Sequence, residues 1–324
     1  MMNHDKGIIL VTLPQDRYGE KEEAALKQEA EGREIVHAIK RPDMQKYADR
    51  TEILIGFGPW GLLAAMPKLR WFQVWSAGVD GLIAHPELKE HPVVITNTSG
   101  MHREQIAEHI FAMILSRNRV FPKIFAAQKR REWITLMDPE TAVLSGKSML
   151  IIGYGAIGEH TAAAARVFGM KVTGIRRRQA PICGDVRVET MEKLPELLPE
   201  ADYVVNILPY TQETKNILGK KEFALMKQGA VYVNVGRGLT NDEAALIEAL
   251  RSGRLAAALL DVTATEPLPS DSPLWGMENV IVTPHYAGMR PDYPALAMEI
   301  TLENLKRYNL GEPLVNLVDK HAGY

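Results

Sequence analysis

The stretch Met149–Arg178, MLIIGYGAIGEHTAAAARVFGMKVTGIRRR, decides the fold of this chain. It opens with an apolar run of strand length, Met149–Ile152, and it closes with a second one, Lys171–Ile175. Between them lie a glycine-rich turn and an alanine-rich segment, Glu159–Phe168, that has the composition of a helix. Strand, turn, helix and strand within about 30 residues predict a βαβ unit. The glycines of the turn have the spacing G-x-G-x-x-G and are Gly153, Gly155 and Gly158.

This glycine spacing is typical of turns that bind a dinucleotide. Gly153 permits the tight bend, Gly155 lets the backbone approach a pyrophosphate, and Gly158 lets helix and strand pack closely. The N–H groups at the start of the helix then face the phosphates. Glycines also punctuate turns that bind nothing, but this motif follows a strand and precedes a helix, so we expect a dinucleotide site.

Three arginines at the end of the second strand indicate which dinucleotide is bound. A site for NAD usually has Asp or Glu at this point, where it accepts a hydrogen bond from the ribose 2′-hydroxyl. This chain has Arg176, Arg177 and Arg178 instead. Guanidinium groups favour a 2′-phosphate, so we expect NADP(H) to be the preferred cofactor. The alternative is a solvated basic run beside a site that binds NAD(H).

The bulk composition narrows the class of protein. The length of 324 residues suggests two domains. A formal net charge of −2 gives no indication of a nucleic acid or an anionic membrane surface as a partner. One cysteine, Cys183, excludes internal disulfides and suits a reducing compartment. Since we find no apolar run of membrane-spanning length, no signal peptide and no metal-ligand motif, we expect a cytoplasmic protein without a metal.

Strand and helix patterns alternate along the rest of the chain, which predicts an α/β protein with parallel sheets covered by helices. One helix, Asn241–Arg251, has a capping-box signature in Thr240 and Glu243. The other expected helices are Arg17–Glu31, Pro42–Ala48, Pro59–Leu69, Met101–Arg119, Phe121–Trp133 and Tyr293–Leu310; the other expected strands are Gly7–Thr12, Glu34–His37, Glu52–Ile55, Trp71–Trp75, Val93–Thr96, Asp185–Val188, Asp202–Leu208, Ala230–Val235, Leu255–Asp261 and Asn279–Thr283.

Residues that can carry out chemistry follow three of these expected strands. Arg237, Glu266 and His285 come after the strands that begin at Ala230, Leu255 and Asn279. Ligands of open α/β sheets bind beyond the carboxyl ends of the strands, so these side chains should lie near the nicotinamide. Arg237 can bind a substrate carboxylate, His285 can donate a proton to a carbonyl oxygen, and Glu266 can orient the imidazole. Taken singly, each could be a surface or structural residue.

The chain resembles the D-isomer-specific 2-hydroxyacid dehydrogenase family over nearly its whole length. Four blocks carry the resemblance, in the order and at the spacing of the family: LPYTQETKNIL, MKQGAVYVNVGRG, DEAALIEALRSGRLAAALLDVTATEPLPSDSPLW and NVIVTPHYAG. The resemblance implies two doubly wound parallel-sheet domains. A Rossmann nucleotide domain, residues 101–293, would be inserted into a flavodoxin-like substrate domain, residues 1–100 and 294–324.

The resemblance also implies roles for individual residues. Arg237, Glu266 and His285 match the Arg-Glu-His catalytic set of the family. Backbone N–H groups near Ala77 and Gly78 would meet the substrate carboxylate. The resemblance places the following residues around the cofactor, in addition to the glycines and arginines named above: Ala156, Ile157, Leu208, Pro209, Thr214, Val235, Gly236, Asp261 and His285. Tyr286, Met289 and Arg290 depart from the residues common in the family at these positions.

These features predict an NADPH-dependent reductase that converts a 2-oxo acid into the D-2-hydroxy acid. Glyoxylate or hydroxypyruvate is the first substrate expected, and a bulkier 2-oxo acid is the next. Two alternatives remain at this point: an NAD-linked dehydrogenase that oxidises the hydroxy acid, and a nucleotide-sensing, corepressor-like protein without turnover. The family resemblance further implies a homodimer formed through the arm around Met101–Lys147.

Overall fold

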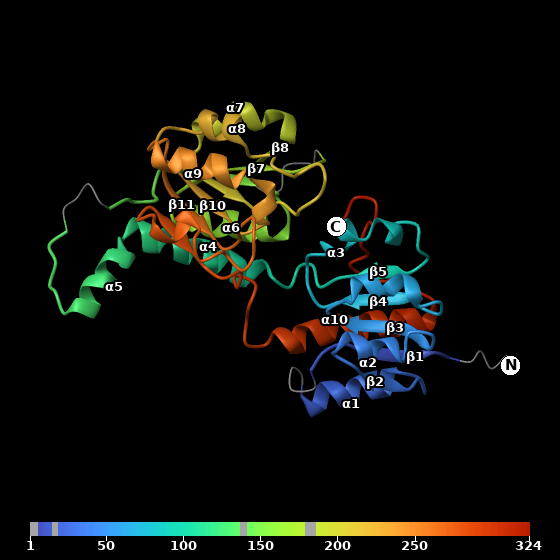
Figure 1. The fold of residues 1–324 in the computed structure, drawn as a ribbon. Coiled ribbons are helices and arrows are strands. Elements are labelled where there is room, and N and C mark those ends of the chain that lie inside the picture. The colour runs from blue at the N-terminus through green and yellow to red at the C-terminus, as the bar shows by residue number, and fades with distance from the viewer. Residues whose placement is uncertain (1–5, 15–18, 137–140, 179–185) are drawn as a thin grey trace. The chain divides into compact units, whose positions relative to one another are not determined.

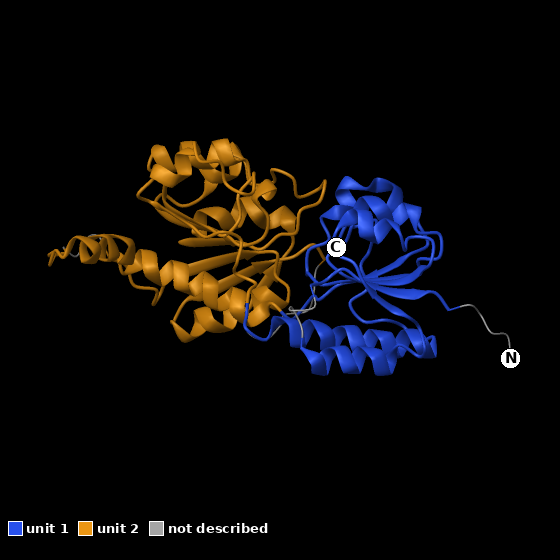
Figure 2. Ribbon diagram, turned by 60° about the horizontal axis from the view of Figure 1, so that its bottom comes forward, with its two compact units in different colours: residues 1–101, 290–324 blue, residues 102–289 orange. Residues whose placement is uncertain are grey.

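The computed structural model describes residues 6–14, 19–136, 141–178 and 186–324. The chain divides into two compact units (Figure 2). Unit 1 consists of Met1–Met101 with Arg290–Tyr324, and unit 2 consists of His102–Met289. Cys183, the start of the helix expected from Arg17 and the start of the strand expected from Asp185 lie outside the described residues.

Unit 2 is built on a parallel sheet of seven strands in its described residues, in the order β12-β11-β10-β9-β6-β7-β8. Figure 1 labels β7, β8, β10 and β11 of this sheet. The chain begins in the middle of this sheet and moves outward twice, which is the Rossmann order extended by one strand. This topology confirms the predicted fold of the nucleotide domain. The strands are β6 (Ser148–Ile152), β7 (Lys171–Ile175), β8 (Arg187–Glu189), β9 (Tyr203–Asn206), β10 (Ala230–Asn234), β11 (Leu255–Leu260) and β12 (Val280–Val282).

Alternate residues of these strands enter two separate cores, one on each face of the sheet. Leu150 and Ile152 of β6 lie in one core, and Met149 and Ile151 lie in the other. Both faces are buried, which explains why the strands are continuous apolar runs and do not alternate with polar residues. The first face is covered by α7 (Leu194–Leu197), α8 (Lys220–Leu225) and α9 (Glu243–Arg251), and the second by α4 (Arg103–Asn118) and α6 (Ala156–Val167); α5 (Phe121–Arg130) follows α4.

Unit 1 contains a five-stranded parallel sheet in the order β2-β1-β3-β4-β5. This is the flavodoxin-like order, and it confirms the second half of the predicted fold. Its strands are β1 (Ile8–Val11), β2 (Ile35–His37), β3 (Thr51–Gly56), β4 (Trp71–Val74) and β5 (Val94–Thr96). Its helices are α1 (Glu20–Glu29), α2 (Arg41–Gln45), α3 (Gly81–Ala84) and the C-terminal α10 (Tyr293–Leu310).

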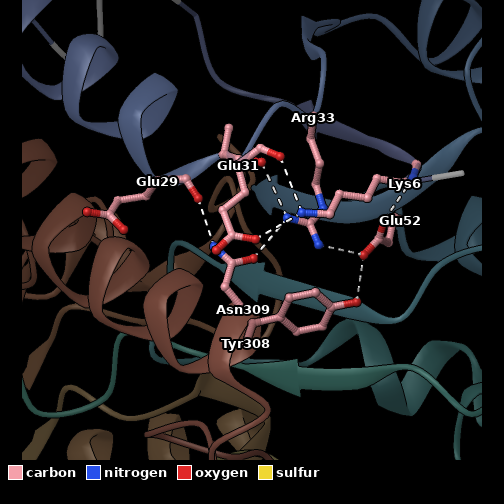
Figure 3. Close-up of polar contacts among 9 residues, drawn as sticks. Lys6, Glu29, Glu31, Arg33, Glu52, Tyr308 and Asn309 are labelled. Atoms are coloured by element: carbon pink, nitrogen blue, oxygen red, sulfur yellow. Dashed lines mark hydrogen bonds and ion pairs between the residues drawn. The ribbon is translucent and has the colours of Figure 1, made fainter. Parts of the chain in front are cut away.

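A polar cluster joins α10 to the N-terminal part of unit 1 (Figure 3). Arg33 donates to Asn309 Oδ1 at 2.8 Å and to Glu52 Oε1 at 3.1 Å. The Tyr308 hydroxyl donates to the same carboxylate oxygen at 3.0 Å, and Asn309 Nδ2 donates to the carbonyl of Glu29 at 2.8 Å. The last helix is therefore an integral part of this unit, although the whole of unit 2 separates it in sequence from the first part.

Two local predictions were wrong. The segment expected as helix Pro59–Leu69 forms a 3-10 helix, Trp60–Ala65, because Gly61 and Pro67 weaken an α-helix at both ends. Helix α9 is capped by Asp242, whose side chain accepts a hydrogen bond from the N–H of Ala245 at 3.1 Å. The side chains expected to form the capping box instead bind loops, as described below.

None of the helices in the described part of the chain has both the length and the hydropathy that a membrane crossing requires.

Candidate active site

The glycine turn after β6 has the geometry that its spacing predicts. Gly153 has φ +95°, and a Cβ there would lie 2.9 Å from the carbonyl carbon of Ile207. The N–H groups of Gly153 and Tyr154 both donate to the carbonyl of Ile175, at 2.9 and 2.7 Å. The turn is therefore held between the ends of β7 and β9, and only glycine fits at its first position.

The start of α6 is open, which fits a bound pyrophosphate. Gly155 is the N-cap residue, and a Cβ there would meet no atom within 4 Å. Ala156 and Ile157 form the first turn of the helix, where N–H groups have no partner within the helix. A Cβ on Gly158 would lie 3.3 Å from the side chains of both Ile151 and Tyr154, so a larger residue there would press the helix away from β6.

The three arginines follow the end of β7, as predicted. The N–H of Arg176 donates to the carbonyl of Glu189 at 3.0 Å, which aligns the chain beside β8. Arg176 is half-buried, and Arg177 and Arg178 are exposed. Their place beyond the second strand of the βαβ unit is where the ribose of a bound dinucleotide is expected.

The loop after β9 is ordered by its own side chains. The carboxamide of Asn206 accepts from the N–H of Leu208 at 3.1 Å. The hydroxyl of Thr214 donates to the carbonyl of Pro209 at 2.7 Å, and it accepts from the N–H of Thr211 at 2.8 Å. Because β9 is parallel to and paired with β6, this loop leaves the same edge of the sheet as the glycine turn, and a Cβ on Gly153 would lie 3.1 Å from the backbone nitrogen of Leu208.

The loop that carries Arg237 leaves β10 between two neighbouring loops. A Cβ on Gly236 would lie 2.5 Å from the carbonyl oxygen of Leu208, and one on Gly238 would lie 2.0 Å from the backbone of Thr263. Both flanking positions therefore require glycine. Val235, which precedes them, is buried.

A buried network of uncharged side chains holds the main chain of Arg237. Its carbonyl accepts from Asn234 Nδ2 at 3.2 Å and from the hydroxyl of Thr240 at 2.6 Å. The same hydroxyl accepts from Asn206 Nδ2 at 2.7 Å. Asn234 and Asn206 are fully buried, and the Arg237 side chain is half-buried, with Nη1 donating to the carbonyl of Gly236 at 2.8 Å.

His285 and Glu266 form a direct pair. His285 Nδ1 lies 2.6 Å from Glu266 Oε2, and Glu266 Oε1 accepts from the N–H of Thr263 at 3.1 Å. The two side chains are 46% and 36% exposed, so the pair is accessible to a ligand. The other ring nitrogen of His285, Nε2, is then available to exchange a proton with that ligand.

The contact between His285 and Glu266 also shifts the pKa of each side chain. The hydrogen bond to Glu266 raises the pKa of His285 above its ordinary value, although burial and the charge of Arg237 act in the opposite direction. Burial would raise the pKa of Glu266, but the hydrogen bonds from His285 and Thr263 and the charge of Arg237 hold it below its ordinary value. A protonated imidazole beside a carboxylate is suited to proton donation.

Asp261 fixes the loop that carries His285. Its Oδ1 accepts from the N–H of Tyr286 at 3.1 Å, and its Oδ2 accepts from the N–H of Ala287 at 3.0 Å. Its carbonyl accepts from the N–H of His285 at 2.9 Å. Asp261 is 2% exposed, so its carboxylate is a buried support of this loop.

The structure thus brings most of the predicted site residues to one edge of the unit 2 sheet. Ala77 and Gly78 belong to unit 1, where the carbonyl of Ala77 accepts from Asn97 Nδ2 at 2.8 Å; their contact with substrate stays a prediction. Sequence reasoning missed the supporting residues Asn206, Asn234 and Thr240, because nothing in their spacing distinguishes them from core or capping residues.

Comparisons with known proteins agree with this site. The family model described as "D-isomer specific 2-hydroxyacid dehydrogenase, NAD binding domain" matches residues 111–287. Glyoxylate/hydroxypyruvate reductase B of Enterobacter sp. (strain 638) is 35% identical over 264 residues, which cover 81% of this chain and 81% of that protein.

Solved structures of other proteins share the fold, and two of them are the following. A D-isomer specific 2-hydroxyacid dehydrogenase of Xanthobacter autotrophicus Py2, in complex with NADPH and MES, has a TM-score of 0.82 and 31% identity, and the match covers 98% of this chain and 100% of that one. An NADPH-dependent glyoxylate/hydroxypyruvate reductase of Sinorhizobium meliloti, in complex with NADP and sulfate, has a TM-score of 0.83 and 29% identity, with coverage of 98% and 100%. The chain belongs to the D-isomer specific 2-hydroxyacid dehydrogenase family and is an NAD(P)-dependent oxidoreductase.

Proposed function

We propose that this protein reduces a 2-oxo acid to the D-2-hydroxy acid with NADPH, and that His285 donates the proton. The observation that carries the proposal is the His285–Glu266 pair, 2.6 Å apart, at the sheet edge that also holds Arg237 and the glycine turn. Bound NADPH would supply the hydride to the carbonyl carbon.

The residues of the chain supply the rest of the reaction. The Arg237 guanidinium binds the substrate carboxylate and sets the orientation of the carbonyl group. As the carbonyl carbon gains the hydride, its oxygen takes the proton from His285 Nε2 and becomes the hydroxyl of the product. The Glu266 carboxylate keeps His285 protonated before the transfer and fixes the plane of its ring.

The preference for NADPH rests on the arginines after β7. Arg176, Arg177 and Arg178 follow the second strand of the βαβ unit, and we expect their guanidinium groups to bind a 2′-phosphate. Two similar solved structures contain NADPH or NADP, which supports this assignment. Glyoxylate and hydroxypyruvate are the first substrates to test because a relative of 35% identity is a reductase of these acids.

The test is the rate of reduced-nicotinamide oxidation with glyoxylate, hydroxypyruvate, pyruvate and phenylpyruvate, each with NADPH and with NADH. We expect NADPH to support the higher kcat/KM, and we expect only the D-isomer on chiral analysis of the product. Arg176→Asp should lower the NADPH/NADH ratio of kcat/KM by about tenfold or more, the effect of losing one charged hydrogen bond.

Lys171→Asp is the matched control for that variant. It makes the same change of charge on an exposed residue at the opposite end of β7, so it should leave the ratio unchanged. An unchanged ratio in Arg176→Asp would show that Arg176 does not bind the 2′-phosphate. Tight NADPH binding without turnover of any 2-oxo acid would favour the nucleotide-sensing alternative, and turnover only of hydroxy acids with NAD would favour the oxidising dehydrogenase.

We also propose that the protein is a homodimer formed through the arm that contains α5. Phe121 and Phe125 stack at 5.4 Å between centroids and are 41% and 52% exposed. Trp133 is fully exposed. An exposed pair of aromatic rings such as Phe121 and Phe125 is typical of a surface that a partner covers. Sedimentation should give a dimer, and Phe125→Glu should shift it toward the monomer.

A further inference from the structure

We propose that His109, on α4, is a positioning residue for His285 and acts through Thr283 and Asp261; this inference rests on the proposed function. His109 belongs to none of the strand-end loops that carry the active-site side chains. Its imidazole nevertheless lies against the residues that hold the His285 loop. The ring is 11% exposed, so it is part of the packed structure of unit 2.

Two hydrogen bonds link His109 to Asp261 through Thr283, and their donors can be assigned. The hydroxyl of Thr283 lies 2.6 Å from Asp261 Oδ1 and donates its proton to it. That hydroxyl has no second proton, so it must accept from His109 Nε2, which lies 3.0 Å away. The geometry therefore requires His109 to carry its proton on Nε2. The result is a chain of donors from His109 through Thr283 to Asp261.

Asp261 binds the backbone of the loop that carries His285. Three consecutive N–H groups, those of His285, Tyr286 and Ala287, donate to Asp261. His285 has φ +49°, a left-handed conformation that is unfavourable for a residue with a side chain. Such a conformation persists only where its surroundings hold it in place. The orientation of the imidazole toward Glu266 thus depends on a loop whose backbone is bound by Asp261. Thr283 and His109 in turn hold the Asp261 carboxylate in place through their hydrogen bonds.

The surroundings of His109 suit a neutral donor. Its ring meets the ring of Tyr286 edge to face, 5.1 Å between centroids, and the side chain of Met113 lies near Thr283. Among the described residues, the carboxylate of Asp261, 3.5 Å from Nε2, is the charged group whose effect on the His109 ring is resolved. Burial lowers the pKa of His109, while the charge of Asp261 opposes this shift. His109 is thus disposed to stay neutral at the pH where His285 is protonated.

The test uses His109→Leu, which removes the donor and keeps most of the volume, and His109→Gln, whose amide can place an N–H near the position of Nε2. The first readout is the titration of the His285 imidazole by NMR in the protein without ligands, with its resonance assigned from His285→Asn. The second is kcat with the best 2-oxo acid. Thr283→Val breaks the same chain at its middle, and Glu108→Gln changes an exposed neighbour on α4 as a control.

We expect His109→Leu and Thr283→Val to lower the pKa of His285 by about 0.5 and kcat by about fivefold, since a looser loop weakens the bond to Glu266. His109→Gln and Glu108→Gln should behave like the wild type. An unchanged His285 titration in His109→Leu, or the same defect in His109→Gln, would overturn the inference. Failure of the proposed function would appear separately, as a wild-type protein that reduces no 2-oxo acid while the His285 titration still responds.

Discussion

The loop that carries Arg237 and the loop that carries His285 leave the same edge of one sheet, but different chemistry holds them. The carbonyl of Arg237 is bound by Asn234 and Thr240, which are buried and uncharged. The backbone of the His285 loop is bound by the buried carboxylate of Asp261. An amide and a hydroxyl do not titrate, so the support of Arg237 should not depend on pH.

This difference matches the task proposed for each side chain. An arginine stays protonated at any pH of interest and needs only a fixed position. A histidine that donates a proton must keep a suitable pKa as well as its position, and a carboxylate behind its loop adds negative potential, which favours the protonated ring. The variants below are designed to separate these two kinds of support, from the largest expected effect to the smallest.

Removing the proton donor should have the largest effect. His285→Gln keeps a polar side chain of similar reach but cannot transfer a proton at neutral pH. We expect kcat for 2-oxo acid reduction to fall by roughly 10²- to 10⁴-fold. The Kd for NADPH, measured by fluorescence titration, should change little. The control is His321→Gln, an exposed histidine near the C-terminus, and equal kcat in the two variants would refute the role of His285.

Removing the partner of His285 should have the next largest effect and should depend on pH. The hydrogen bond to Glu266 raises the pKa of His285, so reduction should be fastest below that pKa and should decline as the pH rises through it. Glu266→Gln removes the negative charge, so the decline should begin at lower pH. At pH 8 the combined loss of protonation and orientation should lower kcat/KM by roughly 10- to 100-fold. A decline that stays at the wild-type pH would contradict this assignment.

Changing the support of the His285 loop should cost activity and stability together. Asp261→Asn preserves the shape of the side chain but turns one acceptor into an N–H group, which would face a backbone or hydroxyl donor. We expect kcat to fall roughly tenfold and the free energy of unfolding to fall by roughly 1.5–3 kcal/mol, the range for a hydrogen bond to a charged group. Urea titration and steady-state kinetics measure the two effects. A stable variant with wild-type kcat would show that Asp261 is not the support of the loop.

Sequence reasoning succeeded where local pattern determines the structure. The G-x-G-x-x-G spacing requires particular backbone conformations, and the structure shows φ +95° at Gly153 and an open N-cap at Gly155. Arg237, Glu266 and His285 could be placed near one another because parallel strands end at a common edge. The four sequence blocks that resemble the family identified it correctly, and the two doubly wound sheets that this resemblance implied are present in the structure.

The supporting residues could not be predicted, because their role depends on which loops meet in space. Thr240 and Glu243 fit a capping box by spacing, yet Thr240 binds the carbonyl of Arg237 and Glu243 accepts from the N–H of Ala264. His109 occupies a position on α4 that the periodicity of the helix leaves ambiguous. Its partner Thr283 lies 174 residues away in the sequence. Which of these hydrogen bonds form depends on tertiary packing, which cannot be read from the spacing of residues in the sequence.

The smallest expected effect tests the uncharged support. Thr240→Val keeps the shape of the side chain but removes the hydroxyl that donates to the carbonyl of Arg237 and accepts from Asn206. A buried amide N–H of Asn206 then loses one of its partners, so the free energy of unfolding should fall by about 1–3 kcal/mol. A less constrained Arg237 should raise KM for the 2-oxo acid by a few fold, roughly the effect of one neutral hydrogen bond. The pH at which kcat/KM declines should stay at the wild-type value, since no charge near His285 has changed. A shift of that pH would show that the two loops are coupled and that the uncharged network also sets the pKa of His285.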